Sequence, residues 1–343
     1  MRRIGNTLLS VGALGLIAAA LLAAPTGAKA PRAHAAATPC VKATNIEAII
    51  DDSGSMGGTD LNTLRVKGLK LLINTLSPGT FLGAVEFGSS FDPTIPSADT
   101  VFKPEAVGPN AVAMGAALDQ KIMADNGGTD YNAAFAQSDL DNPNAAARIF
   151  LTDGGHNVGT YNNGHLTHKA PTYVIGFSPG LAAPADQARL QQIASDTGGQ
   201  YFGLTDSSQL QSVINGVGAA ITCQTPPQTF TDPLTAGQSK SHAVSIGGST
   251  KSIQIALTWA SPLDKFSISG LKLVSHGKTV AVGARKKKPR KLTVKTTTSP
   301  TFTLLKVSRL KAGKLKFKVK ATAVGSGAPQ VSLTTQVSQS RSK

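Results

Sequence analysis

The chain has 343 residues and a formal net charge of +15 at pH 7. Residues 1–35 place Arg2 and Arg3 before an apolar stretch that is too short for a confident membrane span, which is typical of a secretory signal peptide. No second apolar stretch is long enough to cross a bilayer, and this excludes a multi-span membrane protein. We therefore expect a secreted or cell-envelope protein, and the alanine-rich leader suggests a bacterial one.

Charge divides the remaining chain into two halves. Residues 36–223 hold 9 Lys and Arg against 17 Asp and Glu, a net charge of −8, whereas residues 224–343 hold 21 against 2, a net charge of +19. The boundary falls at a Thr-Pro-Pro sequence, where consecutive prolines favour an extended linker. Because roughly 300 residues exceed what one core usually serves, we expect two domains, at 36–223 and 231–343, joined by a linker at 224–230.

The two cysteines of the chain, Cys40 and Cys223, stand at the two ends of the acidic half. In an oxidising compartment such a pair is typical of a disulfide that joins the ends of one domain, since domain ends commonly lie close together. The alternative is two independent buried thiols. The even count and the export signal favour the disulfide.

Strands and helices alternate along the acidic half. An almost continuously apolar run at 44–51 predicts a strand that is covered on both faces. Asp60 offers an N-cap to a leucine-rich helix, and Gly198 and Gly199 offer a left-handed end to a later one. Further strands are expected at 81–87, 100–102, 148–152, 172–177 and 200–202, and helices at 111–123, 131–140, 185–197 and 206–217. This order predicts an α/β fold with a parallel sheet and helices on both faces, which binds ligands beyond the carboxyl ends of its strands.

Three short segments of the acidic half supply oxygen ligands at that edge of the sheet. Asp51 and Asp153 each end an apolar strand, so their carboxylates should converge where the strands emerge. Ser53, Ser55 and Thr129 add three neutral hydroxyls. An all-oxygen set of low charge suits a hard cation such as Mg²⁺ better than zinc. The sequence therefore predicts a divalent metal site made by these five residues.

Such a site would hold a dication with few charged ligands, so we expect it to bind an Asp or Glu carboxylate of a protein partner. The alternatives are a metal that only stabilises the fold, or no metal. Asp52 and Asp130 lie beside the predicted ligands and are interpreted as solvated loop acids. His156 is interpreted as a surface histidine of the same loops.

The three segments, Asp51-Asp52-Ser53-Gly54-Ser55-Met56, Gly127-Gly128-Thr129 and Leu151-Thr152-Asp153-Gly154, resemble the von Willebrand factor type A domain in type, order and position. The resemblance covers residues 41–222. It implies a Rossmann-like sheet with a metal-ion-dependent adhesion site that holds Mg²⁺, or Mn²⁺ or Ca²⁺. In this arrangement the two serines bind the metal directly, and the threonine and the two aspartates bind it directly or through water. The resemblance also implies that a disulfide sometimes joins the ends of the domain.

Two of the usual catalytic motifs are missing. The sequence contains no His-Glu-x-x-His and no phosphate-binding Gly-x-x-x-x-Gly-Lys. A hydroxyl-rich metal shell without a nearby general base makes a poor hydrolase. We expect a non-enzymatic adhesion or ligand-binding protein. A scaffold or accessory subunit of an exported enzyme or envelope complex is the alternative, and a hydrolase with an unrecognised site is the third possibility.

The basic half alternates apolar and polar residues in short runs, which is typical of strands. Runs at 253–259, 266–273, 315–321 and 331–337 predict an all-β, antiparallel sandwich. The pattern is weakly similar to the pre-peptidase C-terminal modules of secreted bacterial proteins.

Lysines and arginines gather at two places in this half. The residues are Arg285, Lys286, Lys287, Lys288, Arg290 and Lys291 in one loop, and Lys314, Lys316, Lys318 and Lys320 along one strand. A net charge of this size attracts polyanions, and an anionic cell-wall or membrane polymer is the expected partner. Specific nucleic-acid binding is not expected, because stacking aromatic residues are nearly absent. The alternative is a solvated face whose lysines protect a sheet edge.

Overall fold

The structure is a computed structural model, and it describes residues 42–88, 96–123, 127–162, 170–177, 183–205, 207–224, 227–281, 292–328 and 330–341. The predicted signal peptide, Cys40 and the loop cluster at 285–291 lie outside the described residues. Both the signal peptide and the Cys40–Cys223 disulfide therefore stay predictions. Within the described ranges, no helix is both long and apolar enough to cross a membrane.

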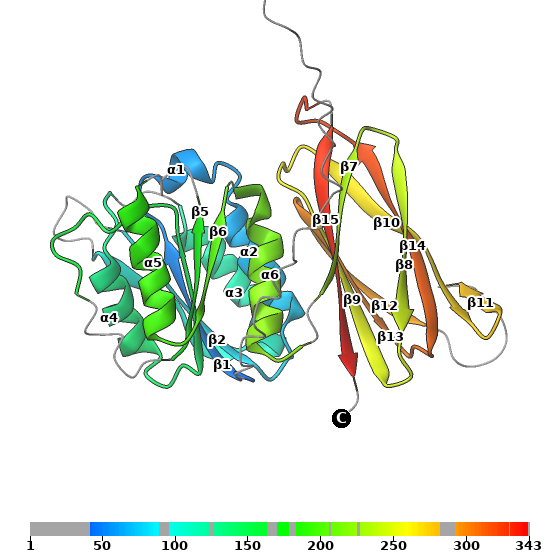
Figure 1. The fold of residues 1–343 in the computed structure, drawn as a ribbon, viewed down its shortest axis with the longest axis horizontal. Helices are drawn as coiled ribbons and strands as arrows, with labels where there is room; N and C mark the ends of the chain where they lie inside the picture. Colours follow the sequence, from blue (N-terminus) through cyan, green and yellow to red (C-terminus); the bar gives the residue numbers. More distant parts are fainter. Residues whose placement is uncertain are drawn as a thin grey trace, which may run out of the picture. The chain divides into compact units, whose positions relative to one another are not determined.

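The first half of the described chain is an α/β fold, as predicted (Figure 1). Its sheet has the strand order β3-β2-β1-β4-β5-β6, with every neighbouring pair parallel except β2 and β3. The strands are β1 (Asn45–Asp51), β2 (Phe81–Phe87), β3 (Ala98–Ala106), β4 (Ala147–Thr152), β5 (Thr172–Phe177) and β6 (Gln200–Leu204). The edge strand β3 is antiparallel because the connection from β2 is too short for the helical crossover that a parallel pair needs. The sheet is thus parallel, as predicted, except at this one edge, which makes it mixed.

Helices cover both faces of this sheet. They are α1 (Met56–Thr59), α2 (Leu64–Thr75), α3 (Val107–Lys121), α4 (Tyr131–Asp141), α5 (Pro184–Asp196) and α6 (Leu210–Ile221), with a 3-10 turn at Ser207–Gln209. Side chains of α2, α3 and α6 pack into one apolar core with one face of the strands, and those of α4 and α5 pack into a second core on the other face. Strand β1 contributes to both cores, because successive side chains point to opposite faces. This explains its continuous apolar run.

Helix α2 begins later than the sequence predicts, at Leu64. The predicted cap residue, Asp60, still acts on it. Its Oδ1 accepts a hydrogen bond from the Leu64 backbone N–H at 2.7 Å, and its Oδ2 accepts one from the Arg65 backbone N–H at 3.0 Å. The carboxylate therefore binds two free N–H groups of the first turn from a position four residues upstream.

Glu47 is a charged side chain in the middle of β1, and it is fully buried. Its Oε2 accepts a hydrogen bond from the Asn142 side chain at 2.9 Å, and its Oε1 has no partner. Burial raises the pKa of Glu47 from its ordinary value of 4.5 to about 8; the bond from Asn142 opposes this rise. The folded protein therefore holds this carboxyl in its protonated form at neutral pH.

Replacing Glu47 with glutamine should flatten the pH dependence of stability. Between about pH 4.5 and pH 8 the unfolded chain releases the Glu47 proton and the folded chain keeps it, so the free energy of unfolding falls as the pH rises and the loss is complete above pH 8. Glu47→Gln removes this loss, which is on the order of 4 kcal/mol at pH 8. Urea unfolding at pH 5, 6.5 and 8 measures it, with the exposed Glu105→Gln as control. Equal slopes for Glu47→Gln and the wild-type protein would contradict the prediction.

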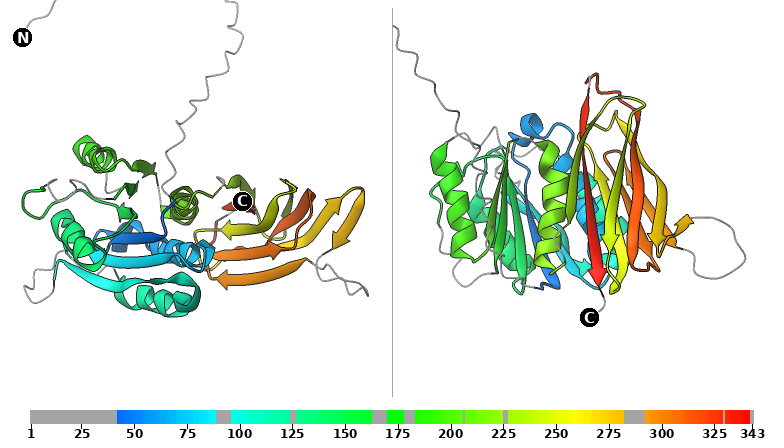
Figure 2. Two further views of the ribbon diagram at one scale, coloured as in Figure 1. Left: turned by 90° about the horizontal axis from the view of Figure 1, so that it is seen from below. Right: turned by 45° about the vertical axis from the view of Figure 1, so that its right-hand side comes forward.

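The second half of the described chain is all-β, as predicted, and consists of two antiparallel sheets (Figure 2). Their orders are β11-β10-β14-β8 and β12-β13-β9-β15-β7. The strands are β7 (Gln228–Leu234), β8 (Ser239–Ile246), β9 (Thr250–Thr258), β10 (Lys265–Ser275), β11 (Lys278–Ala281), β12 (Thr293–Ser299), β13 (Phe302–Ser308), β14 (Gly313–Ala323) and β15 (Val331–Arg341). Inward side chains of both sheets form one apolar core, so the sheets pack face to face. Strand β7 begins at Gln228, inside the segment expected as a linker.

The two halves also contact each other directly. Leu71 of α2 packs with three apolar side chains of the second half, Ala256, Phe302 and Leu304. Around this contact, amide side chains donate several hydrogen bonds between the two halves. Gln211 donates to the Trp259 carbonyl at 2.9 Å, Asn215 donates to Gln336 at 2.7 Å, and Gln254 donates to the Thr75 carbonyl at 3.0 Å. Helices α2 and α6 thus bury side chains against the sheet of β9, β13 and β15.

Candidate metal-binding site

The two predicted carboxylates lie at the same edge of the first sheet. Asp51 is the last residue of β1, and Asp153 follows the last residue of β4. These strands are parallel neighbours, with Ile50 opposite Leu151, so their carboxyl ends emerge together. Both aspartates are fully buried. The parallel pairing therefore brings together two residues that are about a hundred positions apart in the chain.

A series of hydrogen bonds connects the loop after β1, called the first loop, with the loop after β4, called the second loop. The Ser53 backbone N–H donates to Asp51 Oδ1 at 2.9 Å. The Ser53 and Ser55 hydroxyls lie 3.0 Å apart, and the Ser55 hydroxyl donates to Asp153 Oδ1 at 2.8 Å. Four of the five predicted ligands thus form one hydrogen-bonded set.

The loop that precedes α4 and carries Thr129, called the third loop, lies against the other two. The Gly54 backbone N–H donates to the Gly127 carbonyl at 3.1 Å, which ties the first loop to the third. A Cβ placed on Gly154 would lie 3.5 Å from the Thr129 hydroxyl and 3.9 Å from the Ser55 hydroxyl, so both hydroxyls stand close to this glycine. Asn157 holds the threonine backbone, since its side chain accepts from the Thr129 N–H at 2.7 Å. The structure therefore brings all five predicted residues to one place, and their role as metal ligands stays a prediction.

Two threonines at the site were not predicted from the sequence. The Thr59 hydroxyl, at the end of the short helix α1, donates to Asp153 Oδ2. The Thr152 hydroxyl, on the last residue of β4, donates to Asp51 Oδ2 at 2.5 Å. Thr152 precedes the predicted ligand Asp153, so its place at the site could have been predicted from the sequence. Thr59 could not, because the four-residue helix that carries it is too short to show a helical periodicity.

The site concentrates negative charge. Burial, together with the nearby charge of Asp153, raises the pKa of Asp51 to about 6, and hydrogen bonds from Ser53 and Thr152 oppose this rise. In the part of the chain that the structure describes, no lysine, arginine or histidine forms an ion pair with either aspartate. Two buried carboxylates beside neutral hydroxyls, with no basic side chain to balance them, are a donor set that fits a hard divalent cation.

Asp52 is not the solvated loop acid that the sequence suggests. Its side chain is fully buried, its Oδ1 lies 2.7 Å from Arg65 Nη2, and its Oδ2 accepts the Met123 backbone N–H at 3.0 Å. Arg65, equally buried, also pairs with Asp60 at 3.1 Å. The prediction was wrong because a cation from α2, 13 residues further along the chain, lies under the loop. Asp52 therefore anchors the first loop from below.

The two other polar neighbours of the site also have structural roles. Asp130 caps α4, and its side chain accepts the Asn132 and Ala133 backbone N–H groups at 3.0 and 3.2 Å. His156 accepts the Tyr131 backbone N–H at its Nδ1 at 3.1 Å. Its ring also contacts Tyr131 and Tyr161, and burial lowers the pKa of His156. The histidine is therefore a half-buried acceptor that fixes the start of α4.

Comparisons with known proteins bear on this arrangement. The family model of the von Willebrand factor type A domain matches residues 45–216. No curated protein matches the sequence. Among solved structures, the chain is similar to a von Willebrand factor type A protein from Catenulispora acidiphila, with 17% identity and a TM-score of 0.42 over 87% of this chain and 63% of that chain.

Two further similarities are to surface proteins of bacteria. The pilus adhesin SpaC from Lactobacillus rhamnosus GG, in its open conformation, has 11% identity and a TM-score of 0.43 over 85% of this chain and 43% of that chain. The PilB minor pilin from Streptococcus sanguinis has 14% identity and a TM-score of 0.40 over 52% of this chain and 61% of that chain. The chain spans less than two thirds of the length of each of these three proteins.

Proposed function

The chain belongs to the von Willebrand factor type A family, and from this premise we propose that it is a secreted or envelope-associated binding protein. It captures an acidic group of a protein partner at a divalent metal held by the loops that follow β1 and β4. One observation carries the proposal. Asp51 and Asp153 are buried together without a basic partner among the described residues, and the Ser53 backbone N–H with the Ser53 and Ser55 hydroxyls links them.

The residues of the site divide into ligands and supports. Asp51, Ser53, Ser55, Thr129 and Asp153 are the proposed ligands, and Mg²⁺ is the expected ion, with Mn²⁺ or Ca²⁺ as alternatives. The Thr152 hydroxyl orients Asp51, and the Thr59 hydroxyl orients Asp153. Since only two ligands carry charge, a bound dication would supply an electrophilic position for a carboxylate oxygen.

We propose no catalytic role for this site. The described residues hold no group of three or more His, Cys, Asp or Glu side chains placed to bind a metal ion. The nearest histidine, His156, already accepts a backbone hydrogen bond. Among the described residues, the site therefore offers hydroxyls and two carboxylates that these hydroxyls already bind, which suits binding better than hydrolysis.

Removing one carboxylate should abolish the metal affinity. Asp153→Ala deletes a charged ligand, so the affinity for Mg²⁺ or Mn²⁺ should fall by more than the roughly 100-fold that losing an outer support costs. Titration calorimetry with the metal alone measures this. The exposed Asp119→Ala is the control, because it removes the same charge outside the site.

The outcomes separate the competing functions. Equal Mg²⁺ affinity for the wild-type protein and Asp153→Ala, or no binding at millimolar metal, would contradict the proposal. If metal binds as expected, an envelope-protein fraction retained on the immobilised protein should be released by a chelator. A partner that is retained equally with the chelator and on Asp153→Ala would favour the alternative, a scaffold or accessory subunit.

A further inference from the structure

One face of the second half carries a regular row of lysines. Along β14, Lys314, Lys316, Lys318 and Lys320 are exposed, while the residues between them are buried. Alternation along a strand sends these four side chains to the same face, about 7 Å apart. The neighbouring strand β10 adds Lys272, which lies directly opposite Lys316. These five lysines are called the lysine face below.

Small hydroxyl side chains flank the lysines on both neighbouring strands. On β8, the residues opposite Lys314, Lys318 and Lys320 are serines, and on β10 the residues opposite Lys318 and Lys320 are serines. These are Ser239, Ser241, Ser245, Ser267 and Ser269. The row therefore stands above short neighbours that leave its ammonium groups accessible and that can themselves donate hydrogen bonds.

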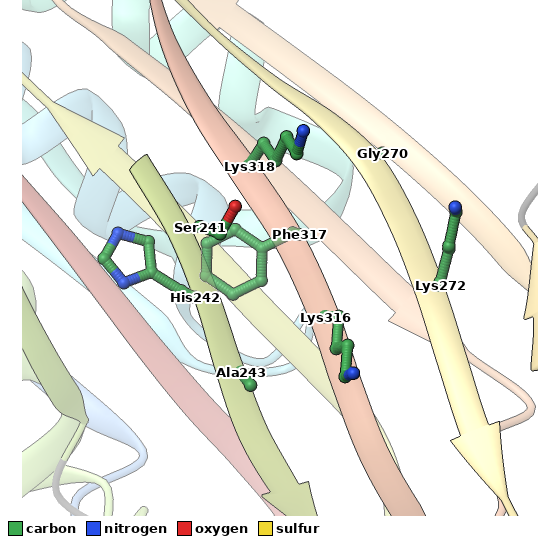
Figure 3. Close-up of a pocket in the computed structure, with 8 residues that line it drawn as sticks. All are labelled: Ser241, His242, Ala243, Gly270, Lys272, Lys316, Phe317 and Lys318. Atoms are coloured by element: carbon green, nitrogen blue, oxygen red, sulfur yellow. The ribbon is translucent and has the colours of Figure 1, made fainter. Parts of the chain in front are cut away.

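A shallow depression lies across this face. It has a volume of about 490 Å³ and is lined by Lys272, Lys316 and Lys318 together with Ser241, Ala243, Gly270 and the buried His242 and Phe317. Figure 3 shows the three lysines rising from β14 and β10 and Ser241 from β8. The register of β10 shifts between Ser269 and Lys272, so the strand is irregular at this point.

Within the described part of the second half, no carboxylate is free to balance the positive charge of the face. Residues 224–343 contain only two acids, Asp232 and Asp264. Both are buried and engaged elsewhere. Asp232 lies 2.6 Å from His242, and Asp264 accepts the backbone N–H groups of Gly325 and Ser326. Like charges directly opposite each other destabilise a sheet, so placing Lys272 against Lys316 costs stability that a bound anion would restore.

We propose that the lysine face binds an extended, linear phosphodiester polymer, with phosphates seated along β14 and the flanking serines donating to their oxygens. An ammonium group binds phosphate as a point charge, and a regular row of them matches a polymer with regularly repeated anions. The two aromatic rings that line the depression, His242 and Phe317, are buried, so they are not free to stack on bases, and a polyol phosphate fits the face better than a nucleic acid. This binding is independent of the metal site and goes beyond the proposed function.

The test compares two triple variants of the full chain that lose the same charge. Lys272→Gln/Lys316→Gln/Lys318→Gln removes the centre of the lysine face. The control, Lys251→Gln/Lys295→Gln/Lys311→Gln, removes three exposed lysines from the other sheet and from a loop. Binding to poly(glycerol phosphate) is measured between 50 and 200 mM salt.

We expect the face variant to lose about tenfold or more in affinity at 50 mM salt, and its salt slope to fall by about two, since each lost ammonium–phosphate contact lowers the slope by roughly 0.7 to 0.9. The control should stay within about twofold of the wild-type protein, and Asp153→Ala should bind the polymer normally. If Asp153→Ala loses metal binding but still binds the polymer, the two sites are independent, and a failure of the metal proposal can be told apart from a failure of this one.

Several results would overturn the inference. Equal losses in the two triple variants would show that only net charge matters. Loss of all binding on neutralising Arg285 to Lys291 alone would assign the polymer to that segment instead. Phosphatidylglycerol vesicles and single-stranded DNA are tested in the same way. If the face variant loses binding to one of these but not to poly(glycerol phosphate), the ligand of the face is a membrane surface or a nucleic acid instead of the polymer.

Discussion

Replacing Arg65 with methionine should lower the free energy of unfolding by about 3–5 kcal/mol, because it leaves two buried carboxylates without their cation. The Arg65 guanidinium lies 2.7 Å from Asp52 and 3.1 Å from Asp60, and all three side chains are fully buried. Methionine fills similar space but carries no charge. Urea unfolding at pH 7 measures the loss.

The control for this prediction is an exposed ion pair of the same half. Lys121 lies 2.6 Å from Asp99, and both side chains are more than 40% exposed. Lys121→Met should cost at most about 1 kcal/mol, since water screens such pairs. Similar losses for Arg65→Met and Lys121→Met would show that burial of the Arg65 pairs contributes little, and would contradict the prediction.

The Arg65 prediction also bears on the site. Asp52 stands between Asp51 and Ser53, so an Asp52 that has lost its cation shifts the first loop. We expect Arg65→Met to weaken metal binding as a positioning effect, with the ligands intact. The double variant Asp52→Asn/Arg65→Met, which removes both charges, should recover part of both stability and metal affinity.

Gly199→Ala should destabilise the protein by about 3 kcal/mol or more through overlap with backbone. A Cβ on Gly199 would lie 2.0 Å from the carbonyl oxygen of Thr172 and 2.5 Å from its carbonyl carbon. Thr172 is the first residue of β5, which is paired with β4 on one side and β6 on the other, and its backbone cannot move aside as a flexible side chain would. Thermal or urea unfolding measures the loss.

The neighbouring glycine is the matched control. Gly198 has a φ of 71° and nothing within 4 Å of the position of a Cβ. It is the left-handed residue of a Schellman motif at the end of α5, in which the Gly199 N–H donates to the Ala194 carbonyl and the Gly198 N–H to the Ser195 carbonyl. Gly198→Ala should therefore cost only about 1–2 kcal/mol of backbone strain. A larger loss for Gly198→Ala than for Gly199→Ala would refute this assignment.

Much of the first half could be predicted from local patterns. Strands β2 and β5 were predicted at their exact bounds, and β1, β4, α4 and α5 within one residue at each end. Buried parallel strands are continuously apolar, and surface helices repeat every three to four residues. The left-handed end of α5 was predicted from its two glycines. The direction of β3 and the true start of α2 were not, since both depend on neighbours in space.

The second half was predicted less completely. Its class was right, but strands β7, β8, β11, β12 and β13 were not located. Strand β12, for example, is Thr-Val-Lys-Thr-Thr-Thr-Ser and has no buried residue, so it has no apolar alternation to recognise. Strands at or near a sheet edge can be polar on both faces, because the pairing of their backbone with one neighbour stabilises them.

The sequence by itself determined the charge division, the alternation that puts four lysines of β14 on one face, and the five oxygen-bearing residues of the candidate site. Each of these follows from residue type and local spacing. Only the tertiary structure decided that Arg65 lies under the first loop, that Thr59 reaches Asp153, that Gly199 lies against Thr172 and that Lys272 stands opposite Lys316. The physical reason is that these contacts join residues from different elements, and no periodicity of a single element records which residue of another element it will meet.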